Sequence, residues 1–116
     1  MLGLSRRVRV FAYQSPVDMR KSFNTLSGLV LSLGHDITAG DVFVFMGKRR
    51  RRAKVLWFDG TGLCLLAKRL EKGHFARVWE RTELTASELV LFLEGSALVG
   101  RMALSPPAFD IERDGR

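Results

Sequence analysis

The sequence has few of the residues that mark a secreted or metal-binding protein. Its 116 residues include one cysteine and two histidines. Cys64 has no second cysteine for an internal disulfide, and His35 and His74 have no further ligand at zinc-binding spacing. We therefore expect a protein of the reducing cytoplasm with no metal site and no cofactor. Cys64 lies among leucines and is expected to be inert core.

Long apolar runs are also missing. No run approaches the roughly 18–20 residues that a membrane helix needs, and arginines interrupt the N-terminal "MLGLSRRVRV" before it could serve as a signal peptide. No membrane partner is expected. With 47% apolar and 27% charged residues, the composition is that of a folded domain with a single core. We predict one domain over residues 1–104 and a flexible tail over residues 105–116.

Acidic residues are absent from the most basic segment. The chain holds 19 Lys and Arg against 12 Asp and Glu, a net charge of +7. Six of these cations and no anion fall in residues 48–54, so the rest of the chain is almost neutral. The cations are Lys48, Arg49, Arg50, Arg51, Arg52 and Lys54. Because the excess is local, it produces a directed field.

The hydrophobic pattern predicts an α+β fold, an antiparallel sheet of about five strands packed by two helices on one face. Alternation over residues 6–13 indicates a first strand with Val8, Val10 and Ala12 inward. Four short apolar runs between residues 41 and 80, "DVFVFM", "KVLWFD", "GLCLLAKRL" and "FARVWE", are expected to pair as a meander. Residues 47–53 then form the tip of its first hairpin.

Two helices flank the meander in the sequence. Ser15 and Pro16 fit the cap and first position of one helix, which should end at Gly34. Its apolar stripe is Met19, Phe23, Leu26, Val30 and Leu33. The second helix begins at Thr85, which forms a capping box with Glu88 and is flanked by the staple pair Leu84 and Leu89. Leu89, Phe92 and Leu93 should form its buried face.

Arginine favours bidentate phosphate contacts, so the basic hairpin is a candidate DNA-binding site. A second cluster surrounds the "EKGH" turn at the same end of an antiparallel sheet. Its DNA-binding candidates are Lys68, Arg69, Lys72 and Arg77. Phosphate contacts by all six hairpin cations would give a salt slope of roughly −5. A solvated basic loop is the alternative.

Other site hypotheses are weaker. Asp59 with Glu80 is the best available carboxylate pair for a two-metal nuclease, but Asp59 also fits a simple turn. The "DMRK" stretch after Pro16 could form a polar site or only a helix start. Strand aromatics could stack on bases, although the strands are apolar on both faces and favour a core role. These aromatics are Phe43, Phe45, Trp57, Phe58, Phe75 and Trp79. No catalytic residue is assigned.

Two stretches carry a family resemblance, "PVDMRKSFNTLSGLV" and "VLWFDGTGLCLLAKRLEKGHF". Together with the basic hairpin and "ELTASELVLFLEG", they resemble the small accessory proteins, called TnpB, of the insertion-sequence 66 family of transposable elements. The likeness runs from about Val8 to Gly95. It implies a helper encoded beside a larger transposase, with no catalytic residue to carry over.

The leading hypothesis is a non-catalytic transposition accessory protein that contacts DNA, the transposase, or both, through the basic hairpin. The alternative is a protein–protein adaptor for the transposase without direct DNA binding. Self-assembly into a homo-oligomer is compatible with either. A small Mg²⁺-dependent nuclease is a third reading.

Overall fold

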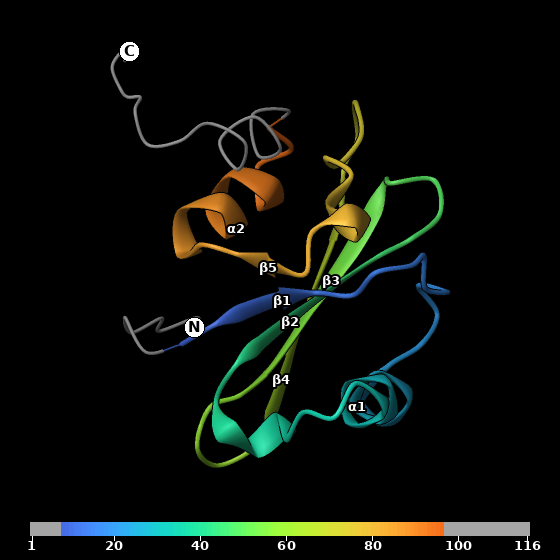
Figure 1. Cartoon of the computed structure of the whole chain (residues 1–116). Coiled ribbons are helices and arrows are strands. Elements are labelled where there is room, and N and C mark those ends of the chain that lie inside the picture. Colours follow the sequence, from blue (N-terminus) through green and yellow to red (C-terminus); the bar gives the residue numbers. More distant parts are fainter. Residues whose placement is uncertain (1–7, 97–116) are drawn as a thin grey trace.

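The sheet has five strands in the spatial order β4-β3-β2-β1-β5 (Figure 1). This computed structural model describes residues 8–96. The strands are β1 (Val10–Ala12), β2 (Val42–Met46), β3 (Arg52–Phe58), β4 (Leu63–Arg69) and β5 (Glu83–Leu84). The α-helices are α1 (Phe23–Ser32) and α2 (Ala86–Leu93), and two short 3-10 helices are η1 (Ile37–Ala39) and η2 (Val78–Glu80). The predicted α+β class is confirmed.

Only part of the predicted meander forms. β2, β3 and β4 pair antiparallel in succession, but β1 pairs with β2 in parallel. The predicted fourth strand, residues 75–80, is wrong. Phe75 and Val78 are both buried and lie three residues apart, whereas a strand places buried side chains at alternate positions. The 3-10 helix η2 forms at residues 78–80 instead. The remaining edge of the sheet is β5, which pairs antiparallel with β1.

The two α-helices cover opposite faces of the sheet, which corrects the expectation that they share one face (Figure 1). Val42, Val44 and Met46 of β2 point into a core with Leu89 and Phe92 of α2. The alternate β2 residues, Phe43 and Phe45, join Leu26 and Val30 of α1 in a second core. A strand covered on both faces must be apolar at every position, and all five residues of β2 are buried.

The first helix begins at Phe23 with Ser22 as its cap, seven residues later than predicted. Residues 16–21 instead cross the end of β2, where the Val17 N–H donates to the Met46 carbonyl at 3.0 Å. Asp18 then closes a turn: its carbonyl accepts the Lys21 N–H and its carboxylate accepts the Arg20 N–H. Such local hydrogen bonds compete with helical ones, so the helix begins only after this turn. The predicted stop at Gly34 is confirmed, with φ of 85°.

The capping box that starts α2 is confirmed. The Thr85 hydroxyl accepts the Glu88 N–H at 3.0 Å, and the Glu88 carboxylate accepts the Thr85 N–H at 2.9 Å. Glu88 is buried, and burial by itself would raise the pKa of its carboxyl group. Hydrogen bonds from the Arg81 guanidinium, 3.0 Å away, and from the Thr85 amide have the larger combined effect, so the pKa is lowered. Leu89 and Phe92 are buried as predicted, whereas Leu93 is half-buried.

The predicted tail, 105–116, lies outside the described residues. Within residues 8–96, no helix is long and apolar enough to cross a membrane.

Candidate nucleic-acid interface

The loop between β2 and β3, residues 47–51, carries most of the basic segment. The Arg50 N–H donates to the Gly47 carbonyl, and Arg50 takes a left-handed backbone with φ of 57°. Gly47 is buried against Met19, and a Cβ at this position would lie 2.8 Å from Met19 Cγ. Any side chain at this position would have to displace Met19 where residues 16–21 cross the base of the loop.

The segment after β4 runs along the same loop. The Leu70 N–H donates to the Arg51 carbonyl at 2.8 Å, and the Phe75 N–H donates to the Arg50 carbonyl at 2.7 Å. Side chains reinforce the contact, since Arg50 Nη1 donates to the Phe75 carbonyl and Arg51 Nη2 to the Glu71 carbonyl. The hairpin tip and the "EKGH" turn thus lie at one end of the sheet, as the antiparallel geometry predicts.

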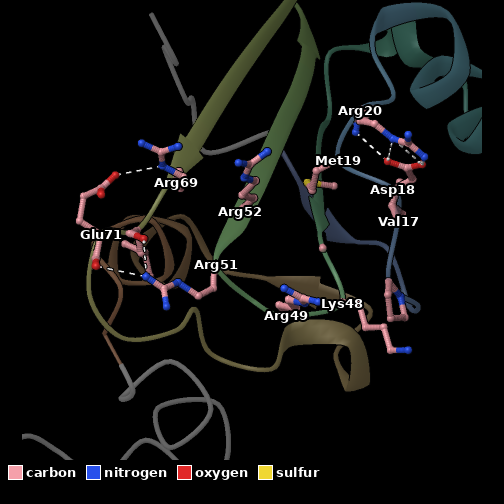
Figure 2. A pocket seen from close by; sticks show the side chains of 13 residues that line it. Val17, Asp18, Met19, Arg20, Lys48, Arg49, Arg51, Arg52, Arg69 and Glu71 are labelled. Atoms are coloured by element: carbon pink, nitrogen blue, oxygen red, sulfur yellow. Dashed lines mark hydrogen bonds and ion pairs between the residues drawn. The ribbon is translucent and has the colours of Figure 1, made fainter.

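These three segments enclose a groove of about 910 Å³, which we call the basic groove (Figure 2). Residues 16–20 form one wall, residues 69–71 form the other, and the hairpin lies between them. Figure 2 shows Arg49 and Arg52 between Arg20 on one side and Arg69 on the other. Six cations line the groove against two anions, Asp18 and Glu71. The cations are Arg20, Lys48, Arg49, Arg51, Arg52 and Arg69.

Four of the groove cations have no anionic partner among the described residues, and one of them, Arg51, donates instead to the Leu70 and Glu71 carbonyls. Among residues 8–96, no carboxylate lies within ion-pair distance of Lys48, Arg49 or Arg52, and all three are exposed. Arg52 also lies directly opposite Arg69 in the β3–β4 ladder. Like charges at opposed positions destabilise a sheet unless an anion screens them. The arrangement is therefore suited to binding an anion.

Each wall of the groove holds one arginine in a local ion pair. Arg20 Nη2 lies 2.7 Å from an Asp18 carboxylate oxygen, and Arg69 Nε lies 3.0 Å from one of Glu71. The Arg20 side chain and backbone N–H hold the pKa of Asp18 well below its ordinary value. The same ion pair raises the pKa of Arg20, so both groups stay charged at neutral pH.

Not every predicted DNA-binding residue lines the basic groove. Lys54 adjoins it, in a hollow of about 260 Å³ that also includes Arg52 and Arg69, and its ammonium donates to the Lys21 carbonyl at 2.6 Å. Lys68 lies on the opposite sheet face, where it donates to the Leu93 carbonyl at the end of α2. There it caps the helix C-terminus.

Arg50, Lys72 and Arg77 also lie outside the groove lining. The Arg50 guanidinium is directed to the Phe75 carbonyl, and Arg77 lies 3.8 Å from the Glu80 carboxylate and over the Trp79 ring. Lys72 is exposed in the turn after β4. The structure therefore divides the predicted set into residues that line the groove and residues that lie outside its lining.

Arg20 is a groove residue that the sequence analysis did not include among the DNA-binding candidates. The available signal was the "DMRK" stretch, treated as a separate polar site. Its position beside the hairpin depends on the Val17–Met46 backbone bond and on the fit of Met19 over Gly47. Both are tertiary contacts between segments about 30 residues apart.

Asp59 and Cys64, the residues considered for other chemistry, have structural roles near the turn of residues 59–62. The Asp59 carboxylate accepts the N–H groups of Thr61 and Gly62, which lower its pKa to about 2, so Asp59 is a turn former. Within residues 8–96, no three His, Cys, Asp or Glu side chains converge on a possible metal position. Cys64 is half-buried on the edge strand β4 rather than in the core, with Sγ 3.5 Å from Asp59.

The strand aromatics are mainly core residues, as predicted. Phe43, Phe45 and Phe75 are each at most 2% exposed. Trp57 and Trp79 pack against the α2-side core, and Phe58 is half-buried. None of the aromatic side chains within residues 8–96 lines the basic groove.

Comparison with known proteins identifies the family. The chain is 43% identical to the uncharacterized protein y4jC of Sinorhizobium fredii over 76 residues, which cover 65% of each protein. It is 39% identical to y4hO of the same organism over 84 residues, 72% of this chain and 71% of that protein. The matches thus span about two thirds of these curated relatives. No solved structure matches the chain significantly. A model of the family described as "IS66 Orf2 like protein" matches residues 8–102, and the chain belongs to that family.

Proposed function

We propose that the protein is a non-catalytic accessory factor in the transposition of an insertion-sequence element and that its basic groove binds the phosphate backbone of DNA. The family suggests an accessory role in transposition. The observation that carries the DNA contact is that three exposed groove cations, Lys48, Arg49 and Arg52, have neither a carboxylate nor a carbonyl partner among residues 8–96. Guanidinium groups match phosphate geometry, and each neutralised phosphate releases bound counterions.

The groove favours duplex DNA over an unpaired strand. Proteins that bind single strands combine a basic groove with aromatic side chains on which bases stack. In the described part of the chain, no aromatic residue lines this groove, and the aromatics of the adjacent strand β2 are buried in the core. Contacts restricted to phosphates position a protein on DNA without reading its sequence. We therefore propose sequence-independent binding to the duplex backbone.

The test compares two double variants with the same change in charge. Arg49→Ser/Arg52→Ser removes two unpaired groove cations, whereas Lys72→Ser/Arg77→Ser removes two exposed cations outside the groove lining. Affinity for a labelled 20-base-pair duplex is measured by fluorescence anisotropy at 50 and 200 mM salt. We expect the groove variant to bind at least tenfold more weakly and to lose about two units of salt slope, and the control to stay within about threefold of wild type. Equal losses in both variants, or no loss in either, would overturn the groove as the site.

A protein–protein adaptor for the transposase is the second candidate, and the outer surface of α1 favours it. Leu31 is 72% exposed there, beside a hollow of about 510 Å³ between α1 and η1. If this surface docks on the transposase, the two proteins co-purify from nuclease-treated, high-salt lysate and Leu31→Glu abolishes the association. Co-purification that is lost on nuclease treatment would favour the DNA-binding role instead.

A further inference from the structure

We propose that Arg52 and Arg69 form a seat for one phosphate group in the basic groove and that Glu71 is an internal anion which this phosphate displaces. The inference deepens the proposed function, on which it rests, by naming the residues that hold a phosphate and the group that competes with it. It concerns an exchange of ion-pair partners and involves no covalent step.

The strand register brings the two arginines together. Arg52 and Arg69 are Cα partners at the end of the β3–β4 ladder, so their side chains project from the same sheet face, with Cβ atoms about 5 Å apart. Both line the basic groove and the smaller hollow next to it. Like charges on directly opposed strand positions repel each other, and a phosphate bound between the two guanidinium groups would accept hydrogen bonds from both.

Arg69 differs from Arg52 in already having an anionic partner. Glu71 Oε2 accepts from Arg69 Nε at 3.0 Å, two residues along the chain, and the two side chains are 77% and 61% exposed. Exposed ion pairs of this kind contribute little stability. A phosphate that contacts Arg52 can therefore take over Arg69 at small cost, and the Glu71 carboxylate can turn into solvent.

The opposite wall of the groove lacks this freedom. The Asp18 carboxylate accepts both the Arg20 side chain and the Arg20 backbone N–H, so it is part of a turn. Displacing the Asp18 carboxylate would remove the Arg20 N–H bond from that turn, whereas the Glu71 carboxylate has no backbone partner to lose among the described residues. This asymmetry selects Arg69, rather than Arg20, as the arginine that changes partner.

The chain offers a matched control for each residue of this pair. Arg77 and Glu80 form another exposed ion pair, 59% and 76% exposed, outside the groove lining. Arg69→Gln and Arg77→Gln thus remove the same charge from equally exposed pairs, and Glu71→Gln and Glu80→Gln form a second matched set. The probe is the same 20-base-pair duplex, titrated at 50 and 200 mM salt.

We expect Arg69→Gln to weaken binding about five- to tenfold and to reduce the salt slope by about one, because a phosphate contact is lost. We expect Glu71→Gln to tighten binding about two- to fivefold, because the competing anion is gone. Arg77→Gln and Glu80→Gln should each change affinity less than twofold. In the Arg69→Gln/Glu71→Gln double variant, the gain from Glu71→Gln should disappear.

Failure of this inference is distinguishable from failure of the proposed function. If Arg49→Ser/Arg52→Ser weakens binding but the Arg69 and Arg77 variants behave alike, the groove binds DNA and the phosphate seat is wrong. The seat is also wrong if Glu71→Gln and Glu80→Gln tighten binding equally, since the effect is then one of net charge. If Arg49→Ser/Arg52→Ser has no effect, the proposed function itself fails.

Discussion

The two hairpin loops at the ends of β3 are built in opposite ways. In the loop of residues 59–62, the Asp59 carboxylate accepts the N–H groups of Thr61 and Gly62 at 2.9 and 3.0 Å, and the Asp59 N–H donates to the Gly62 carbonyl. Gly60 supplies the positive φ of 105°. All of these bonds lie within four residues, so this loop is folded by its own sequence.

The basic loop of residues 47–51 contains no acidic residue and depends on a distant segment. The carbonyls of Arg50 and Arg51 accept N–H groups from Phe75 and Leu70. Because backbone partners hold the loop in place, Arg49 and its neighbours need no carboxylate to fix them. Tertiary support of the backbone thus leaves the charges available for an external anion. β3, about 23 Å long at 3.3 Å per residue, separates this end from the acidic turn.

The largest expected effect comes from removing the anchor of the basic loop. Phe75 is fully buried, with its ring 4.8 Å from that of Phe92, and Phe75→Ala should lower the free energy of unfolding by about 3–5 kcal/mol. Phe58→Ala, at the half-buried end of β3 beside the acidic turn, should cost no more than about 2 kcal/mol. Urea denaturation measures both. Equal losses would show that the two loops do not differ in their dependence on the core.

A smaller effect is expected at Arg50, which combines a left-handed backbone with a hydrogen bond to Phe75. Arg50→Gly relieves the backbone strain and loses the hydrogen bond, and each is worth about 1 kcal/mol. The free energy of unfolding should change by less than about 1 kcal/mol, and affinity for duplex DNA by less than about threefold. The paired measurement on Arg49→Gly should show a clear loss of affinity with unchanged stability. A tenfold loss in Arg50→Gly would place its guanidinium on the DNA.

The smallest effect is the pH dependence of stability that Asp59 contributes in the turn of residues 59–62. The backbone amides of Thr61 and Gly62 lower the pKa of Asp59 from 3.8 to about 2. A lowered folded-state pKa contributes stability that is complete above the unfolded value and lost as the pH falls toward 2. The stability difference between wild type and Asp59→Asn should therefore shrink between pH 4 and 2. Carboxyl carbon shifts in NMR give the midpoint directly, and a midpoint near 4 would contradict the turn geometry.

Local sequence signals predicted local structure well. The Thr85–Glu88 capping box and the stop at Gly34 each involve residues within a few positions, so their chemistry is visible in the sequence. The start of α1 was wrong, because the Asp18 turn and the docking of Val17 on Met46 outweigh the Ser15–Pro16 signal. The parallel pairing of β1 with β2 also has no local signature, since parallel partners are joined only through long connections.

The candidate site shows the same division. The basic hairpin and its position at one end with the turn after β4 followed from charge counting and antiparallel geometry. The sequence did not show that Arg20 belongs to the same groove, or that Lys68 faces the other side of the sheet. The sheet face on which a side chain lies depends on the register of strand pairing. A shift of one residue in the β3–β4 register would exchange the faces of Lys68 and Arg69.

By itself, the sequence determined the α+β class, the family and a concentration of positive charge in seven residues. These are properties of composition, periodicity and local motifs. Only the tertiary structure decided which cations remain unpaired, because pairing depends on contacts between segments distant in the chain. The crossing of residues 16–21 over Gly47 and the bonds from residues 70–75 turn a run of arginines into a groove with two walls.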